Sequence, residues 1–325
     1  MQPTPGRSCP LSYRYAPGAF AGAPALHADT LWIAGGLYGN PYALQALLDA
    51  YLADSGSKAL VFNGDFHWFD VAREDFELID ETVHGFHAIR GNVETEIAAP
   101  EDGAGCGCAY PDWVGEATVA HSNRIIERLR ATGHKSGRDL RALAALPMHL
   151  LAEVGGERVG IVHGDAESLA GWNFSQEVLG TAGGRAQAER QFERAGVGIF
   201  ASSHTCLPVL QPIDLRDGRR LIANNGAAGM PNFRGTRFGL VTRISRHPRS
   251  DALYGKWLGS IHVDALAVRY DHAAWLEWFD ARWPEGTPAS ASYRRRIVDG
   301  PSYEVEQAVR SAVRPDAAVR QTAVA

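Results

Sequence analysis

Hydrophobic and polar positions along the chain alternate between short apolar runs and longer amphipathic segments. The first such unit is an apolar run from Leu31 to Ala34, which a glycine-containing turn separates from an amphipathic segment. Asn40 is a favourable residue to cap a helix and Pro41 is favourable at its first position, so a helix is predicted to begin there. Its apolar face consists of Leu44, Leu47, Leu48, Tyr51 and Leu52.

The same alternation predicts strands and helices through the rest of the chain. Strands are predicted at 59–62, 86–90, 148–154, 158–163, 197–201, 238–244 and 261–269, with a hairpin over 208–224 that turns at Asp217 and Gly218. Helices are predicted near 74–83, 118–132, 138–145, 184–195, 271–282, 291–299 and 303–312, and a long loop over 100–116. Strands that alternate with helices in this way indicate an α/β fold.

Three regions follow from this pattern and from the local composition. Residues 1–28 are rich in Pro, Ala and Gly and are predicted to form an extended arm. Residues 29–250 are predicted to form the main domain. Residues 251–325 are predicted to add a strand and helices to that domain and to end in a frayed tail of about a dozen residues.

Composition and charge narrow the class of protein. The 325 residues are 45% hydrophobic and 21% charged, which is globular composition in a chain long enough for a large core. The net charge of -5 gives no support for a nucleic-acid partner or an anionic membrane surface. The run from Arg294 to Arg296 is a local exception, which we interpret as a solvated helix face.

The chain carries no sign of export or membrane insertion. A basic segment followed by an apolar one is not found at the N-terminus, so no signal peptide is expected. The longest uncharged stretch, 195–213, contains His204, Pro208 and Pro212 and is not expected to span a bilayer. Four cysteines, two of them one residue apart, do not form a disulfide framework. We therefore expect a cytoplasmic protein. The sequence is compatible with a monomer or a homo-oligomer.

Four polar motifs each follow a predicted strand: NGDFHWFD, RGNVE, IVHGD and SSHTC. They contribute Asp65, Asn92, His163 and His204. Because ligands bind at the carboxyl ends of strands in open α/β sheets, we expect these four side chains to lie together. One carboxylate, one amide oxygen and two imidazoles suit Mn, Fe or Zn. Glycine precedes both Asp65 and Asn92, and it is expected to permit a sharp backbone turn at each.

Taken singly, each residue has a simpler explanation. An isolated aspartate after a strand is more often a turn former than a ligand, and a lone histidine is more often structural. The order and placement of all four favour the metal site.

The order of the motifs resembles that of the calcineurin-like metallophosphoesterases, which run D-x-H, G-D-x-x, G-N-H-D/E, H and G-H-x-H. The resemblance covers about residues 30–245. The later segments NNGAAGMPNF and LAVRYDHAAWLEWF also resemble a loop and the closing strand and helix of bacterial members. The resemblance implies a four-layer αββα sandwich in which residues 29–250 form the catalytic domain.

This sequence departs from the family pattern in four places. Gly36 and Tyr38 stand where the family has the aspartate and histidine of D-x-H. Cys206 replaces the second histidine of G-H-x-H, and Val93 replaces the histidine of G-N-H. In the family, one metal uses the D-x-H pair and the last histidine, and a shared aspartate binds both metals.

The ligands of the other metal are all retained. By the resemblance, these ligands are Asp65, Asn92, His163 and His204. The sequence therefore predicts one divalent or transition metal ion (Mn, Fe or Zn) per chain, where the family binds two.

A site with one metal needs a further acid or charge, and three side chains are candidates for a catalytic role. Tyr38 would donate a hydrogen bond to phosphate or ligate oxidised iron, or else pack as an aromatic on the sheet edge. His67 would act as an acid or an extra ligand, or else bond the backbone of its loop. Glu94 would serve as the acid, or else cap a turn.

The cysteines allow further alternatives. Cys106 or Cys108, together with Cys206, would form a second site for a softer metal, because thiolates prefer such metals. A cysteine would alternatively act as a nucleophile. The simpler interpretation is that all of them are reduced, unreactive thiols, since C-x-C lacks the paired spacing of a zinc site.

Substrate contacts are predicted for three more residues. Trp172 and Phe174 follow His163 and would stack on a ring of the substrate, or else cover the edge of the core. Asn225 lies in a glycine-containing segment that would offer donors to an anion, or else form a plain turn.

The function expected from these observations is metal-dependent hydrolysis of a small phosphate ester, a phosphodiester or a nucleotide-like molecule. One alternative is a non-catalytic relative that binds a phosphorylated ligand or a partner. A weaker alternative is a metal- or thiol-dependent enzyme that acts on a substrate without phosphate.

Overall fold

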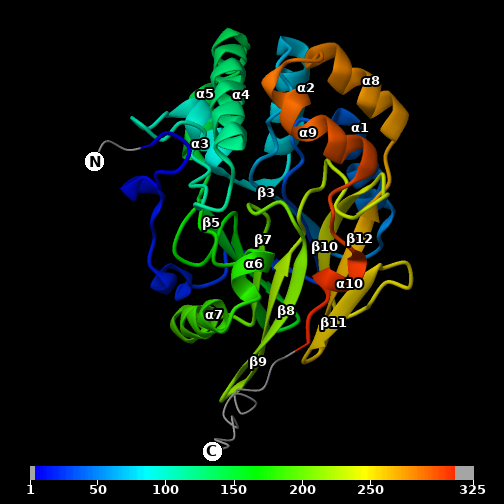
Figure 1. Cartoon of the computed structure of the whole chain (residues 1–325). Coiled ribbons are helices and arrows are strands. Elements are labelled where there is room, and N and C mark those ends of the chain that lie inside the picture. Colours follow the sequence, from blue (N-terminus) through cyan, green and yellow to red (C-terminus); the bar gives the residue numbers. More distant parts are fainter. Residues whose placement is uncertain (1–3, 312–325) are drawn as a thin grey trace, which may run out of the picture.

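Two β-sheets pack face to face in the computed structural model, which describes residues 4–311 (Figure 1). The first sheet has the strand order β1-β5-β6-β7-β9-β8 and the second has the order β11-β12-β10-β2-β3-β4. The strands are β1 (Leu26–Ala28), β2 (Thr30–Ala34), β3 (Lys58–Asn63), β4 (His87–Ile89), β5 (His149–Val154), β6 (Glu157–Val162), β7 (Ile199–Ser202), β8 (Val209–Leu215), β9 (Gly218–Asn224), β10 (Gly239–Ser245), β11 (Tyr254–Leu258) and β12 (Ile261–Val268).

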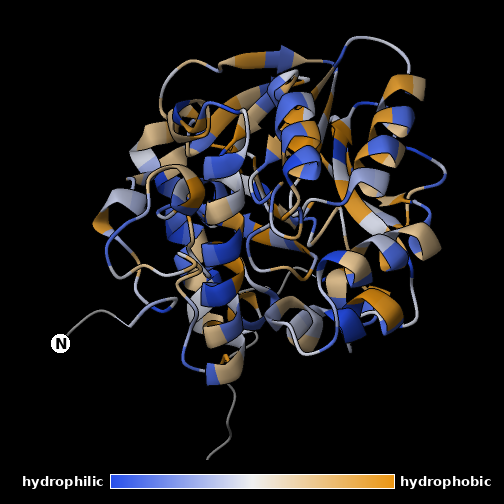
Figure 2. Cartoon of the chain, turned by 90° about the horizontal axis from the view of Figure 1, so that it is seen from above, coloured by the Kyte–Doolittle hydropathy of each residue, from blue (hydrophilic) through white to orange (hydrophobic). Residues whose placement is uncertain are grey.

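Helices cover the outer face of each sheet. They are α1 (Pro41–Ala53), α2 (Arg73–His84), α3 (Asn92–Ala98), α4 (Glu116–Lys135), α5 (Leu140–Ala145), α6 (Gln176–Leu179), α7 (Ala182–Ala195), α8 (His272–Arg282), α9 (Pro288–Asp299) and α10 (Val305–Ala308). Figure 1 shows α2, α4, α8 and α9 gathered at the top of the view and α7 toward the bottom. In Figure 2 the helices carry both hydrophobic and hydrophilic residues, as amphipathic packing requires.

The alternation of side chains along β2 shows how the layers form. Leu31 and Ile33 point between the two sheets, where they pack in one core cluster with residues of both. Trp32 and Ala34 point the other way and pack beneath α1, α2, α4 and α8 in a second cluster. A third cluster joins the first sheet to α6 and α7. The fold is therefore α/β with four layers, as expected from the order of the motifs.

Most of the predicted elements are present, and the exceptions are short. Asn40 caps α1 as predicted, and its Oδ1 atom accepts a hydrogen bond from the Ala43 amide at 3.0 Å. The prediction missed α3, α6, β1 and β11, which have three to seven residues and too little length to show a period. The helix predicted over 303–312 is limited to α10, and the predicted frayed tail lies outside the described residues.

Residues 4–28 carry regular structure. They contain two short 3₁₀ helices, Leu11–Tyr13 and Pro17–Phe20, and strand β1, which pairs in parallel with β5. Tyr13 and Phe20 are buried. This region is thus packed against the first sheet, close to the loop at 100–116.

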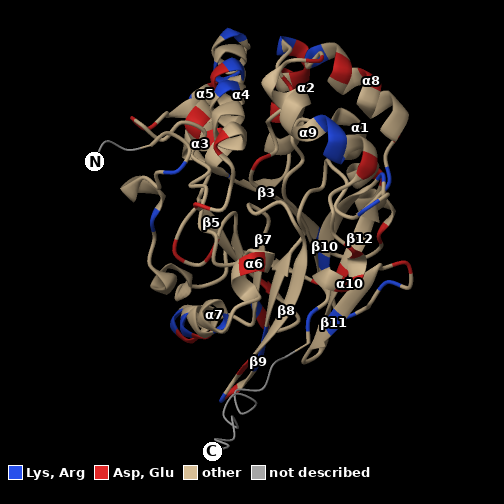
Figure 3. Ribbon diagram, viewed as in Figure 1, with Lys and Arg blue, Asp and Glu red and all other residues tan. Residues whose placement is uncertain are grey.

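Acidic and basic residues are interspersed over the helices seen in Figure 3. In the run on α9, Arg294 is exposed and pairs with Asp280, as expected for a solvated face. Arg296 differs, because it is partly buried and donates to the carbonyls of Pro231 and Cys206. None of the helices within residues 4–311 combines the length and the apolar character that crossing a membrane requires.

Candidate metal centre

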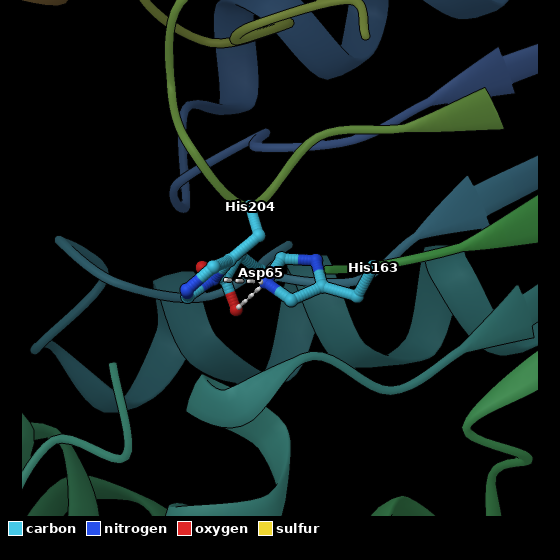
Figure 4. A group of neighbouring side chains, drawn as sticks. All are labelled: Asp65, His163 and His204. Carbon is cyan, nitrogen blue, oxygen red and sulfur yellow. Dashed lines mark hydrogen bonds and ion pairs between the residues drawn. The ribbon is translucent and has the colours of Figure 1, made fainter. Parts of the chain in front are cut away.

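Four strand ends from the two sheets meet at one point. Asp65 follows β3 and Asn92 begins α3 after β4, whereas His163 follows β6 and His204 follows β7. The Nε2 atom of His163 lies 3.2 Å from an oxygen of Asp65 and 3.2 Å from Oδ1 of Asn92. The Nδ1 atom of His204 lies 3.1 Å from the same His163 nitrogen. The donor atoms of Asp65, His163 and His204 all lie within 4.8 Å of one another (Figure 4).

The hydrogen bonds of the two histidines direct one nitrogen of each toward this point. Nδ1 of His163 lies 3.0 Å from the Asn63 carbonyl, to which it donates, so the neutral imidazole presents the lone pair of Nε2 to a cation. Nε2 of His204 donates to the Cys108 carbonyl at 3.0 Å, so Nδ1 keeps its lone pair. A carbonyl on the remote nitrogen is how proteins set the tautomer of a metal-binding histidine. This donor set fits a bound cation.

The charges of the site support the same conclusion. Burial, followed by the neighbouring His163, lowers the pKa of His204 to about 3, so this imidazole is neutral. Burial disfavours the charged form of His163, but the adjacent Asp65 carboxylate raises its pKa overall. Burial would raise the pKa of Asp65, and His163 outweighs it and lowers that pKa. Asp65 is therefore an ionised carboxylate inside a buried site, which attracts a cation.

Glu94 holds the backbone that presents Asp65. Its two carboxylate oxygens accept hydrogen bonds from the amides of Asp65, Phe66, His67 and Gly91, at 2.8 to 3.2 Å. Burial, followed by the charge on Asp65, raises its pKa. Because both oxygens only accept, the group is engaged as a carboxylate and has no proton to give. Its geometry is that of a residue that positions Asp65, and it does not line the cavity.

The glycines before Asp65 and Asn92 serve different purposes. Gly64 has a φ of 74°, in the region that favours glycine, as the sequence predicted. Gly91 has an ordinary φ of -95°, so the turn from β4 into α3 uses no conformation that favours glycine. It is small because a Cβ atom at this position would overlap the Asp65 carboxylate.

Tyr38 and Cys206 occupy the other half of the site. The Tyr38 hydroxyl lies 2.9 Å from the Cys206 sulfur, and both residues line the cavity described below. Burial raises the pKa of Tyr38 well above its usual value and also raises that of the Cys206 thiol. The resemblance puts metal ligands at these positions, and here a neutral hydrogen-bonded pair fills them.

Strained backbone is concentrated in the same place. Within residues 4–311, the residues other than glycine with a positive φ are Tyr38, Asp65, Ala109 and Cys206. Three of them line the cavity, and Ala109 lies between two residues that do. Such conformations cost on the order of 1–3 kcal/mol each and cluster at functional sites.

Cys106 and Cys108 are joined in a disulfide across Gly107. This differs from the expected reduced thiols, and it arises because Gly107, with a φ of 67°, brings the two Cα atoms to 5.4 Å. Sulfurs that are bonded to each other are not thiolate ligands, so neither supplies the predicted soft metal site. Cys206 is free.

His67 lies behind the site. It is fully buried, its Nδ1 atom is 2.5 Å from Asp70, and its ring stacks on Phe76 with the centroids 4.1 Å apart. Burial opposes its charge, but Asp70 and then Asp80 raise its pKa to about 9. This arrangement supports the loop after β3 and does not bring His67 to the cavity.

A cavity of about 40 Å³ opens at the candidate ligands. It is lined by Tyr38, Asp65, Trp68, Asn92, Val93, Cys108, Tyr110, Trp172, His204, Cys206 and Tyr293. Phe174 is not among these residues, because it packs on Phe200 in the core behind the first sheet. Asn225 donates to the carbonyls of Gly35 and Leu240 and thereby ties loops together.

The sequence did not assign four residues to this site, and it placed one of them, Arg296, on a solvated helix face. Trp68 belongs to the motif NGDFHWFD, and its position there was a usable signal. Tyr110 lies in the loop at 100–116, and Tyr293 and Arg296 lie on α9, far away in the sequence. Nothing local to these three indicates that they reach the site.

Comparisons with known proteins establish the fold. No protein-family model matches the chain, and no curated protein matches it. The structure of a metallophosphoesterase from Sphaerobacter thermophilus aligns with a TM-score of 0.50 at 18% identity, over 84% of this chain and 100% of that one. A hypothetical protein from Pyrococcus horikoshii aligns with a TM-score of 0.55 at 16% identity, over 85% and 100%. The chain has the metallophosphoesterase fold, and the resemblance seen in the motifs is confirmed at that level.

Proposed function

We propose that this protein is a hydrolase of small phosphate esters that uses one metal ion and prefers phosphodiesters. The observation that carries the proposal is the convergence of two imidazole lone pairs, the Asp65 carboxylate and the Asn92 amide oxygen on one cavity. This set of nitrogen and oxygen donors suits Mn, Fe or Zn.

The residues present divide the work of such a site. Asp65, Asn92, His163 and His204 would hold the metal ion, which would supply a Lewis acid for a phosphoryl oxygen and would lower the pKa of water. The Tyr38 hydroxyl, which keeps its proton because burial raises its pKa, faces the same cavity as a hydrogen-bond donor. The rest of the cavity has an aromatic lining, which is made by Trp68, Tyr110, Trp172 and Tyr293.

The charge of the site supports a preference for diesters. One divalent cation together with the Asp65 carboxylate carries about one net positive charge, because the Tyr38 and Cys206 pair is neutral and the nearby Glu94 carboxylate and Arg296 guanidinium have opposite charges. A phosphomonoester carries about 1.5 to 2 negative charges at pH 7, whereas a diester carries one. A single metal therefore balances a diester, and a monoester keeps a surplus of negative charge in a buried site.

Two esters with the same leaving group test this proposal. We expect the metal-loaded chain to hydrolyse bis(4-nitrophenyl) phosphate with a kcat/KM at least about tenfold above that for 4-nitrophenyl phosphate, after correction for their intrinsic reactivity. The chain is loaded in turn with Mn, Fe(II) and Zn, and release of nitrophenolate is followed. A preference for the monoester would refute the charge argument. If neither ester is hydrolysed, the proposal that the protein is a hydrolase is refuted.

A second candidate is a protein that binds a phosphorylated ligand without turnover. It is favoured by Val93, an apolar, buried side chain at the position where the family has a histidine. Tight binding of a phosphate ester to the metal-loaded chain, with no product formed, would select this candidate. A thiol-dependent reaction is not proposed, since a raised pKa keeps the Cys206 thiol in its unreactive protonated form.

Restoring the missing ligands is expected to restore a second metal. In a triple variant with Gly36→Asp, Tyr38→His and Cys206→His, elemental analysis should give about two equivalents of metal per chain, where the parent gives about one. Gly36 has a φ of 64°, which aspartate tolerates better than most residues. A Cβ atom there would meet the Tyr38 ring at 2.9 Å, so both positions must change together. The single variant Gly36→Asp is the control and should not gain metal.

A further inference from the structure

Trp172 is fixed directly against a candidate metal ligand. Its ring centroid is 5.5 Å from that of His204, with an interplanar angle of 78°. Its Nε1 atom donates to the Cys108 carbonyl at 3.0 Å, and the same carbonyl accepts the hydrogen bond that orients His204. Trp172 is only partly buried and lines the cavity, so it stands between the ligands and the surface.

A second tryptophan extends this wall outward. The Trp113 ring lies 6.3 Å from the Trp172 ring at an interplanar angle of 85°, so the two rings form a corner. We call Trp113 and Trp172 the aromatic corner. Trp113 is 58% exposed, although most large apolar side chains of the described residues are buried. Because the Trp113 ring contacts a ring that lines the cavity, it continues the aromatic surface of the cavity outward.

The loop holds Trp113 in this exposed position. The Val114 amide donates to the Pro111 carbonyl at 3.0 Å, which closes a turn around Trp113. The Arg7 guanidinium donates to the carbonyls of both Pro111 and Val114, at 2.8 and 2.7 Å. The turn is thus fixed from the N-terminal region by a charged side chain, and the exposed ring is presented on a fixed backbone.

The size of the cavity leaves part of a substrate outside it. A volume of about 40 Å³ holds roughly three water-sized spheres, which is room for a phosphoryl group and not for its substituents. A substituent therefore lies outside the cavity, and beside it Trp172 and Trp113 form an aromatic surface of two rings at an interplanar angle of 85°. Planar aromatic groups stack on such surfaces, and flexible alkyl or sugar groups gain less from them.

We propose that the aromatic corner binds a planar aromatic substituent of the phosphate ester, such as an aryl or nucleobase group. The proposal rests on the proposed function, because it assumes that the phosphoryl group occupies the cavity. It defines the substrate as a small aromatic phosphodiester.

Two phosphonate monoesters test the proposal by binding alone, since they have one negative charge and a carbon–phosphorus bond. The metal-loaded full chain is titrated calorimetrically with the methyl ester of naphthylmethylphosphonate and with that of ethylphosphonate. We expect the aromatic compound to bind at least about tenfold more tightly. In Trp113→Ala the ratio of the two affinities should fall close to one, whereas Trp113→Phe should keep much of the difference.

A matched control is available in Trp257, which is 53% exposed on β11 and does not line the cavity. Trp257→Ala should leave the ratio unchanged. Equal binding of both compounds, or an unchanged ratio in Trp113→Ala, would overturn the aromatic corner and leave the metal site standing. Binding of neither compound to metal-loaded protein would overturn the proposed function and this inference with it.

Discussion

Replacing Asp65 by asparagine is expected to lower the metal affinity of the chain by more than about 100-fold and to abolish ester hydrolysis. The loss of about 100-fold in metal affinity is a lower bound, because changing a residue that only supports a metal ligand already lowers metal affinity about 10 to 100-fold. Asparagine keeps the shape of the side chain and its acceptor for the Val93 amide, so the variant removes the charge and little else. Elemental analysis and kcat/KM for the diester are measured on the same preparation.

The control for this variant is Asp29→Asn, an exposed aspartate between β1 and β2. It should retain about one equivalent of metal and full activity. If Asp65→Asn keeps its metal, Asp65 is not a ligand. If the parent binds no metal after incubation with Mn, Fe and Zn, the four residues do not form a metal site at all.

Replacing Glu94 by glutamine is expected to destabilise the fold and to weaken metal binding together. The amide NH₂ group would face backbone N–H donors that the carboxylate now accepts, at a cost of about 3 kcal/mol in the free energy of unfolding. The loop that presents Asp65 would loosen, and metal affinity should fall by about 10 to 100-fold. Urea denaturation and metal titration measure the two effects.

This variant also separates two roles for Glu94. If Glu94 is a catalytic acid, the variant should have a lower kcat at full metal occupancy, with unchanged stability and metal affinity. If Glu94 is a positioning residue, the variant should lose stability and metal affinity, and saturating metal should recover much of its kcat. Glu127→Gln, at an exposed position on α4, is the control and should change neither quantity.

The layers of the fold and the four candidate ligands were predictable because local rules govern both. A strand covered on both faces has a continuous apolar run, so the run from Leu31 to Ala34 shows that β2 lies between two layers. The strands end where such runs end, and β3 with β4 and β6 with β7 run parallel. The carboxyl ends of β3 and β4 therefore share an edge of one sheet, and those of β6 and β7 share an edge of the other, which places Asp65 near Asn92 and His163 near His204. The packing of the two sheets then brings the two pairs together.

Only the tertiary structure decided how the rest of the site is built. Tyr38 meets Cys206 across 168 positions of sequence, and Arg296 on α9 reaches the Cys206 carbonyl from the other end of the chain. Glu94 was a candidate acid by sequence, and four backbone amides from two loops give it a structural role. No local sequence signal marked Trp113, since its exposure beside Trp172 depends on the hydrogen bonds from Arg7 that fix its turn. A pattern of apolar positions records whether a side chain is buried, and the packing of the two sheets and the loops between them determines which distant side chain it meets.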